Sequence, residues 1–280
     1  MTVPSFAGVT LDPPIVMGIV NVTPDSFSDG GQFSGADDAI GFGRRLVIQG
    51  ARIVDVGGES TRPGAAPVTL EEEIARTVPV VRALAADGIR VSIDTRHAAV
   101  MKAALEAGAA IINDITALEG DPDALRVAAA SDASVVLMHM QGRPETMQIA
   151  PAYQDPAGEI LDYLQGRIDA CLAAGIGRER LCVDPGIGFG KTVEHNLDLL
   201  ARLDLFQGLG VPLLLGVSRK SLIGLLSRQE PPERRLGGSL AAALAGMDRG
   251  AQILRVHDVA ETAQAVAVWH AIRQATPKRN

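Results

Sequence analysis

The chain has 280 residues, a formal net charge of −7 and a hydrophobic content of 47%, with only 3% aromatic residues. The acidic balance argues against nucleic acid or an anionic membrane as a general partner, so a local group of cations must meet any anionic ligand. No apolar run is long enough to span a bilayer, no signal peptide is visible, and Cys171 and Cys182 lack CxxC spacing. We therefore expect a cytoplasmic protein with an aliphatic core.

Short apolar runs rich in β-branched residues alternate with longer segments of helical periodicity. The runs predicted as strands are 15–20, 53–56, 89–93, 110–113, 134–139, 181–184, 212–217 and 252–256. The segments predicted as helices are 37–49, 70–86, 97–107, 122–130, 156–174, 194–201, 233–249 and 259–274. Several helical segments are followed by a glycine, which is typical of a helix C-terminus.

Strict alternation of about eight strands with about eight helices indicates an α/β fold with a parallel sheet. Eight such units also close a barrel, so we expect a single (β/α)8 TIM barrel. No linker or low-complexity segment divides the chain, which predicts one domain over residues 1–280. An open, doubly wound sheet is the alternative.

A long polar segment, with the sequence NVTPDSFSDGG, follows the first predicted strand and covers residues 21–31. It combines many hydrogen-bonding side chains with Gly and Pro, and a simple surface turn does not need so many polar side chains. Loops after buried strands are where parallel α/β proteins place their sites. This segment is therefore a candidate part of a functional site.

The later strands also end in polar motifs. They are GGESTRPG at 57–64, SIDT at 92–95, ND at 113–114, MHMQG at 138–142, DPGIGFGK at 184–191, SRKS at 218–221 and RVHD at 255–258. In a parallel barrel the C-terminal ends of all strands share one rim. We therefore expect one site assembled from many strands.

The residue types on this rim predict a ligand class. Asp94, Asn113 and Asp184 would present acceptors, and one amide that can also donate, inside a concave pocket. This pattern suits a flat heterocycle with an amidine-like N–H edge, such as a pterin. Lys220 can donate to a ring carbonyl or nitrogen on the opposite side.

A second group of rim residues suits phosphate. Arg255 and His257 are two residues apart on a strand, so we expect both to point the same way. With Arg62 they would form a cationic patch for phosphate oxygens. Asn21 offers an oxygen of the kind that Mg²⁺ accepts beside waters and substrate phosphates. A pterin at the centre and a diphosphate at the edge would satisfy both groups.

Several of these residues also have a structural interpretation. Asp94 and Asn113 could cap helices, and Asp184 could end a strand. Solvated charge is the alternative for Lys220. For Arg219 we expect a solvated charge or a surface salt bridge. We interpret the following as structural: Asp114, Asp258, His97, His139, His195 and His270. Asp55 and Glu59 could be buried groups that orient the second loop, and we assign them no catalytic role.

Residues 185–192, with the sequence PGIGFGKT, nearly fit the phosphate-binding P-loop pattern. Pro185 stands where that pattern requires its first glycine. We therefore do not interpret this segment as an ATP site.

Taken in order, the motifs cover nearly the whole chain and resemble those of the dihydropteroate synthases, folate-pathway enzymes targeted by sulfonamides. The resemblance implies a TIM barrel that joins 4-aminobenzoate to 6-hydroxymethyl-7,8-dihydropterin diphosphate. The products would be 7,8-dihydropteroate and diphosphate. It also implies Mg²⁺ as cofactor and a homodimer.

The resemblance assigns roles to individual residues. The pterin would be held by Asp94, Asn113, Asp184 and Lys220. Thr61, Arg62, Arg255 and His257 would hold the diphosphate, and Asn21 the Mg²⁺. Phe27, Pro63, Lys220 and Ser221 would shape the 4-aminobenzoate pocket. The catalytic residues would be Lys220, Arg255, His257 and Arg62.

Two other functions use the same kind of barrel. A methyltetrahydrofolate-dependent corrinoid methyltransferase would have little use for Arg255, His257 and the long first loop. A non-catalytic pterin-binding paralogue would be expected to lose Asn21, Arg62 or Lys220, and all three are present.

Overall fold

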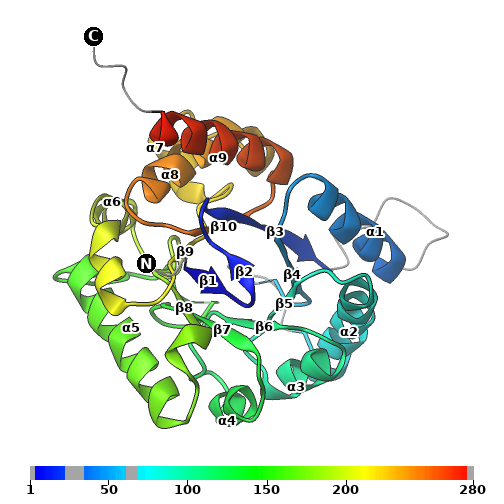
Figure 1. Ribbon diagram of the computed structural model, residues 1–280. Coiled ribbons are helices and arrows are strands. Elements are labelled where there is room, and N and C mark those ends of the chain that lie inside the picture. The colour runs from blue at the N-terminus through cyan, green and yellow to red at the C-terminus, as the bar shows by residue number, and fades with distance from the viewer. Residues whose placement is uncertain (1–3, 23–34, 61–67, 145, 276–280) are drawn as a thin grey trace.

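The computed structural model describes residues 4–22, 35–60, 68–144 and 146–275. Within them, eight parallel strands alternate with helices (Figure 1). These strands are β3 (Ile15–Asn21), β4 (Ile53–Gly57), β5 (Val91–Asp94), β6 (Ile111–Asp114), β7 (Ser134–Met138), β8 (Leu181–Asp184), β9 (Leu214–Leu215) and β10 (Ile253–Val256). A short antiparallel hairpin, β1 (Ser5–Phe6) and β2 (Val9–Thr10), precedes them.

The helices lie outside the sheet. They are α1 (Gly35–Ile48), α2 (Leu70–Ala86), α3 (Ala98–Glu106), α4 (Ala124–Ala129), α5 (Pro156–Ala173), α6 (Val193–Ala201), α7 (Ser221–Leu226), α8 (Leu236–Met247) and α9 (Val259–Gln274). Short 3₁₀ helices are η2 (Arg178–Arg180), η3 (Leu203–Leu209) and η4 (Pro232–Arg234). None of the helices in the described part of the chain is long and apolar enough to cross a bilayer.

The sheet closes on itself. Its strand order is β8-β7-β6-β5-β4-β3-β10-β9, and every neighbouring pair is parallel. The two end strands meet where the Val183 amide donates to the Pro212 carbonyl at 3.0 Å, beside a parallel bridge between Val183 and Leu213. The predicted TIM barrel is confirmed, and the open, doubly wound alternative is wrong. The extent of the domain over all 280 residues stays a prediction.

Local sequence explains where several helices begin. The Thr69 side chain accepts a hydrogen bond from the Glu72 amide at 3.2 Å, and acidic residues fill the first turn of α2. Carboxylates there are stabilised by the helix dipole. Thr192 caps α6 by accepting from the His195 amide at 3.2 Å. The His195 ring accepts in turn from the Thr192 amide at 3.3 Å, so His195 is structural as predicted. The bounds of α2 agree with the predicted 70–86.

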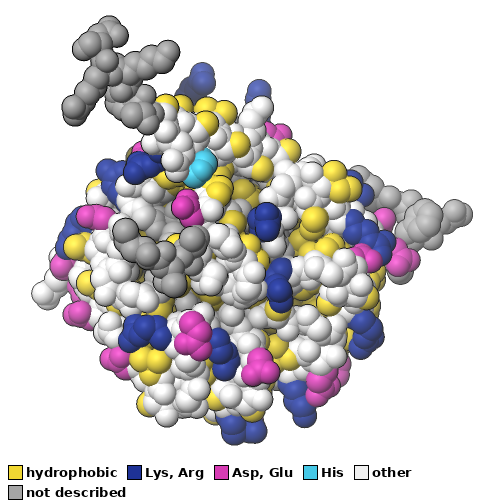
Figure 2. All heavy atoms as spheres, viewed as in Figure 1, with side chains coloured by type: hydrophobic (Ala, Val, Ile, Leu, Met, Phe, Trp, Pro, Cys, Tyr) yellow, Lys and Arg dark blue, Asp and Glu magenta, His cyan; other side chains and the backbone are white. Residues whose placement is uncertain are grey.

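Inward-facing strand residues fill the barrel, and the N-terminal hairpin closes one end. Phe6, Val9 and Leu11 pack in one buried cluster with strand residues such as Met17 and Ile53. In Figure 1 the hairpin lies across the middle of the barrel, and Figure 2 shows positive and negative side chains interspersed on this face. Because the cluster lies at the beginnings of the strands, the hairpin leaves the opposite rim open for a site.

The predictions missed some short elements. The hairpin and α7 were not predicted, and β9 is only two residues long instead of the predicted 212–217. Pro212 has no amide hydrogen to donate to a neighbouring strand, which shortens the ladder there. The helix predicted over 233–249 begins at Leu236, because Pro231 and Pro232 lead into η4 instead.

The loop after β8 depends on glycine backbone geometry. Gly186 has φ +70°, and a Cβ there would lie 1.9 Å from the His139 carbonyl oxygen. Gly166, by contrast, lies on the exposed face of α5, and a Cβ added there would have no other atom within 4 Å among the described residues. A side chain is therefore excluded at Gly186 and tolerated at Gly166.

We predict opposite effects of alanine at these two glycines. Gly186→Ala should lower the free energy of unfolding by roughly 2–4 kcal/mol through left-handed strain and overlap with the backbone. Gly166→Ala should raise it by about 0.5–1 kcal/mol, because glycine in a helix costs entropy. Urea denaturation of both variants measures this. Equal stability of Gly186→Ala and the wild type would contradict the tight approach of the two loops.

Candidate active site

The strand register sets several predicted site residues at one level of the rim. Asn21 pairs with Gly57, Gly57 with Asp94, and Asp94 with Asn113 across neighbouring strands. Neighbouring residues in parallel register point to the same side of a sheet. Gly57 carries no side chain, and a Cβ there would lie 3.5 Å from the Asp94 Cβ. Along this row, Asn21 presents an amide, Gly57 leaves space, Asp94 presents a carboxylate and Asn113 presents a second amide.

Arg255 crosses the barrel to two carboxylates. It lies on β10, in register with the inward-facing Met17 of β3. Its Nε donates to Asp55 Oδ2 at 2.6 Å, and its Nη2 donates to Asp94 Oδ2 at 2.5 Å. Burial raises the pKa of Asp94, and the Arg255 charge opposes that rise. Asp94 is thus an ion-pair partner and does not cap α3, whose N-terminal cap position is His97.

Asp55, one of the two carboxylates that Arg255 contacts, also accepts a hydrogen bond from Asn113. Asn113 is buried at the end of β6, and its Nδ2 donates to Asp55 Oδ2 at 3.1 Å. The helix-cap interpretation of Asn113 is therefore wrong. The interpretation of Asp55 as a residue that orients the second loop did not include these contacts with Arg255 and Asn113.

Asp184 and Lys220 form the other side of the site. Asp184 Oδ1 accepts from the Gly186 amide at 2.8 Å, which closes the turn after β8. Burial raises the pKa of Asp184, while the charge of Lys220 lowers it. The Lys220 ammonium lies 4.1 Å from the centre of the Phe189 ring. Lys220 is half-buried against this ring, and burial lowers its pKa to about 8, so the solvated-charge interpretation is wrong.

His257 differs from the prediction. Its Nδ1 lies 3.1 Å from Ser218 Oγ, and its backbone amide donates to the same oxygen at 3.2 Å. Since Ser218 Oγ accepts from that amide, its hydroxyl hydrogen is free to donate to Nδ1. Burial, with the nearby charges of Arg255 and Arg219, lowers the pKa of His257 to about 4. In the free protein His257 is therefore a neutral ring, not the predicted cation.

Other charges at the rim pair within their loops: Asp114 and Asp258 are structural as predicted, and Arg219 forms a salt bridge, one of its two predicted alternatives. Arg219 Nε donates to Asp258 Oδ2 at 3.0 Å, in a two-point ion pair that joins the β9 and β10 loops. Asp114 accepts from the Thr116 and Leu118 amides at 2.7 and 2.9 Å. Each of these carboxylates has its partners within the loops themselves.

Lys191 explains why the segment at 185–192 is not a phosphate loop. Its buried Nζ lies 3.0 Å from His139 Nδ1 and donates to the Phe189 carbonyl at 2.9 Å. Burial lowers the pKa of Lys191 to about 7 and that of His139 to about 3. The lysine ties the loops after β7 and β8 together, and His139 is structural as predicted.

The remaining assigned residues divide into two sets. Asn21 is half-buried at the end of β3, and Ser221 is the exposed first residue of α7. Phe27, Thr61, Arg62 and Pro63 lie outside the described residues. Glu59 pairs with Arg96 at 3.2 Å, and its role in orienting the second loop stays a prediction, since residues 61–67 lie outside the described residues.

The described part of the rim offers Mg²⁺ few protein ligands. Among the residues that the structure describes, no group of three or more His, Cys, Asp or Glu side chains could hold a metal ion. Asn21 contributes one neutral amide oxygen. This set does not suit an all-protein metal cage, but it fits an ion held mainly by phosphates and waters.

Sequence reasoning missed three contributors to the site: Asp55, Ser218 and Phe189. Asp55 carried a signal, because a carboxylate inside an otherwise apolar strand needs a buried partner. The contacts of Ser218 and Phe189 depend on loops that meet only in the folded barrel.

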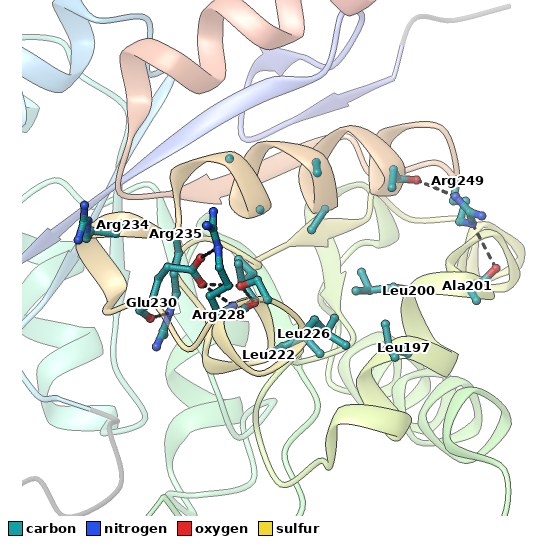
Figure 3. A pocket seen from close by; sticks show the side chains of 17 residues that line it. Leu197, Leu200, Ala201, Leu222, Leu226, Arg228, Glu230, Arg234, Arg235 and Arg249 are labelled. Atoms are coloured by element: carbon teal, nitrogen blue, oxygen red, sulfur yellow. Dashed lines mark hydrogen bonds and ion pairs between the residues drawn. The ribbon is translucent and has the colours of Figure 1, made fainter.

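A hollow of about 660 Å³ lies away from the rim, on the outer helical layer between α6, α7 and α8 (Figure 3). Leucines such as Leu197, Leu200 and Leu226 line it, with Arg228, Arg235 and other arginines near its ends. Its walls are largely apolar, in contrast to the charged rim, so it is a separate feature of the surface.

Comparison with known proteins identifies the family. Residues 17–257 match the family described as "Pterin binding enzyme". Dihydropteroate synthase from Neisseria meningitidis is 50% identical over 94% of each chain, and that from Escherichia coli is 51% identical over 94% of each chain. The chain belongs to the dihydropteroate synthase family.

Solved structures agree with this membership. The dihydropteroate synthase of Xanthomonas albilineans with 4-aminobenzoic acid superimposes with a TM-score of 0.91 at 49% identity, over 96% of both chains. The same synthase in complex with 7,8-dihydropteroate gives 0.88 at 47% identity, covering 96% of this chain and 97% of that one. A Yersinia pestis synthase with a sulfonamide drug gives 0.90 at 49% identity, covering 96% and 98%. Membership in this family of transferases excludes the corrinoid methyltransferase.

We predict that Asp184→Asn weakens pterin binding. An amide NH₂ would face ring N–H donors in a buried pocket, which costs roughly 1–3 kcal/mol for each unsatisfied group. Titration calorimetry with 6-hydroxymethyl-7,8-dihydropterin measures the loss. Asp114→Asn is the control, since that buried carboxylate bonds only its own turn. Unchanged affinity in Asp184→Asn would make Asp184 a turn-closing residue only.

Proposed function

We propose that the rim residues described above carry out the reaction of the family. The enzyme joins 4-aminobenzoate to 6-hydroxymethyl-7,8-dihydropterin diphosphate and releases 7,8-dihydropteroate and diphosphate. The observation that carries this assignment is the pair of carboxylates, Asp94 and Asp184, that face the barrel mouth between the cations Arg255 and Lys220. A flat, polar, partly cationic ring with an anionic tail requires both signs of charge in one pocket.

The pterin contacts follow from donor and acceptor types. The carboxylates of Asp94 and Asp184 accept from ring and amino N–H groups, and the Asn113 oxygen accepts from another. Lys220 donates to a ring carbonyl or nitrogen. These four side chains come from the ends of β5, β6 and β8 and from the start of α7, so the ring is contacted from four different elements.

The chemistry begins with the exocyclic C–O bond, which breaks toward diphosphate and leaves a methylene cation delocalised into the ring. Asp94 and Asp184 stabilise that positive charge electrostatically. The 4-aminobenzoate nitrogen then attacks the methylene carbon, and the nitrogen of the new C–N bond loses a proton to solvent or diphosphate. Because an aromatic amine is neutral near pH 7, this step needs no strong general base.

Arg255 and His257 act on the leaving group. Arg255 already carries its charge at the barrel mouth and can donate to diphosphate oxygens as they gain charge. His257 is neutral in the free enzyme, with Nδ1 accepting from Ser218, so its Nε2–H is the donor. We further assign Thr61 and Arg62 to the diphosphate.

We assign Mg²⁺ to Asn21, with phosphate oxygens and waters as its other ligands. When bound, the ion supplies additional positive charge to the leaving group. The 4-aminobenzoate pocket is assigned to Phe27, Pro63, Ser221 and the alkyl part of Lys220. Of these, Ser221 and Lys220 adjoin each other at the start of α7.

We also propose a homodimer, formed through the hollow between α6, α7 and α8. Leu226 of α7 lines this largely apolar surface and is 55% exposed (Figure 3). A second copy of the chain would cover it, and analytical ultracentrifugation of the wild type and Leu226→Glu tests this. The free, buried thiols of Cys171 and Cys182 fit the cytoplasmic location that we expect.

The direct test of the function is diphosphate release from the pterin substrate. We expect release to depend on both 4-aminobenzoate and Mg²⁺, and 7,8-dihydropteroate to appear in equal amount. Arg255→Lys should retain the charge but lose the two-point contact, and turnover should fall by about 10²–10³-fold. Pterin binding without any diphosphate release would indicate a non-catalytic paralogue instead.

We predict an alkaline limit on activity set by Lys220. Burial lowers its pKa to about 8, so its cationic donor form is present below that pH and is lost above it. The ratio kcat/KM for the pterin substrate should therefore fall as the pH rises through about 8. In Lys220→Arg the guanidinium stays charged, so the residual activity should lack this limb. If kcat/KM fell over the same alkaline pH range in the wild type and in Lys220→Arg, the decrease would belong to another titrating group.

A further inference from the structure

Asp55 is a fully buried carboxylate in the middle of β4. It lies in register with Ile19 of β3 and Ser92 of β5, two residues before the strand ends at Gly57. Its Oδ1 is buried and receives no hydrogen bond from the described residues. The side chain is therefore shielded from solvent and from any ligand at the rim.

The other oxygen of Asp55 accepts from two residues of different strands. Oδ2 lies 2.6 Å from Arg255 Nε and 3.1 Å from Asn113 Nδ2. Arg255 belongs to β10 and Asn113 to β6, so this single atom joins strands on opposite sides of β4. Asp55 Oδ2 therefore links Arg255, the proposed diphosphate contact, to Asn113, the proposed pterin contact.

This contact decides which way the Asn113 amide faces. An ionised carboxylate only accepts hydrogen bonds, so Asn113 must turn its NH₂ group toward Asp55. The Asn113 carbonyl oxygen is then the acceptor that the side chain presents to a ligand. Without Asp55, the amide could rotate by half a turn and present a donor where the pterin also has a donor.

Asp55 also limits how closely Arg255 is bound to Asp94. The guanidinium is shared, with Nε on Asp55 and Nη2 on Asp94, and the Asp94 side chain is still 17% exposed. If Asp55 lost its charge, Asp94 would be the nearest remaining anion for Arg255. Arg255 would then compete more strongly with the pterin for that carboxylate.

We propose that Asp55 is a positioning residue for the reaction, which sets the hydrogen-bond polarity of Asn113 and holds Arg255 away from exclusive pairing with Asp94. It acts through these two residues and contacts no substrate. This inference rests on the proposed function, because it takes Asn113 and Asp94 as pterin contacts.

The test is an exchange of the two side chains. In Asp55→Asn the charge is lost, and in Asn113→Asp two carboxylates face each other. In the double variant, the amide now at position 55 can donate to the carboxylate now at position 113 and accept from Arg255, so an acceptor again faces the ligand. We expect each single change to weaken binding of 6-hydroxymethyl-7,8-dihydropterin, and the double variant to bind at least about tenfold more tightly than additivity predicts.

Steady-state kinetics separate positioning from mere stability. Asp55→Asn should raise KM for the pterin diphosphate and lower kcat, while KM for 4-aminobenzoate stays unchanged. A purely structural loss would reduce the active fraction, and so kcat alone. Asp114→Asn is the matched control, a buried strand-end carboxylate that should lower the melting temperature without changing pterin affinity.

Additive effects in the double variant, or an Asp55→Asn enzyme with normal pterin affinity and KM, would overturn the proposal. If Asp55→Asn does not fold, adding it to Asn113→Asp should still improve both folding and binding, and no improvement overturns the proposal. Asp184→Asn is measured alongside. Weak binding there with normal binding in Asp55→Asn refutes only this inference, whereas normal binding in both refutes the pterin site itself.

Discussion

The closure of the sheet between β8 and β9 is the constraint on which the site depends. A hydrogen bond from Val183 to Pro212 and a single bridge to Leu213 complete a ring of eight parallel strands. Closure brings Asp184 of β8 and Lys220 after β9, which belong to the two ends of the strand order, to one opening. Arg255 of β10 reaches the carboxylates of β4 and β5 at the same rim. The N-terminal hairpin fills the other end with apolar side chains, so polar groups gather at one rim.

The rim concentrates charge that would be costly if its parts were separated. Asp55 is fully buried, and Asp184 and Lys220 have pKa values shifted by burial. Each is tolerated because an opposite charge or a hydrogen-bond donor lies beside it, and a buried charge without such a partner would destabilise the fold. The same arrangement prepares the pocket for a ring that gains positive charge next to a leaving group that gains negative charge, so little reorganisation is needed.

The neutral state of His257 is consistent with that arrangement. A second full cation beside Arg255 in the free enzyme would raise the local repulsion, and burial lowers the pKa of the ring to about 4. Ser218 orients the imidazole through Nδ1, so the histidine is available as a donor without carrying charge. Among the described residues, Arg255 and Lys220 carry positive charge beside Asp55, Asp94 and Asp184.

The amino-acid sequence by itself determined the alternation of strands and helices and the number of strands, eight, that closes a barrel. It also determined that five site residues lie at the rim: Asp94, Asn113, Asp184, Lys220 and Arg255. It did so because the periodicity of apolar residues and the polar strand ends are local properties of the chain. Only the tertiary structure decided which of these residues touch, for the contacts of Asp55 join residues 58 and 200 positions apart in sequence. It likewise decided the charge of His257, because a pKa depends on burial and on neighbours that strand closure brings together.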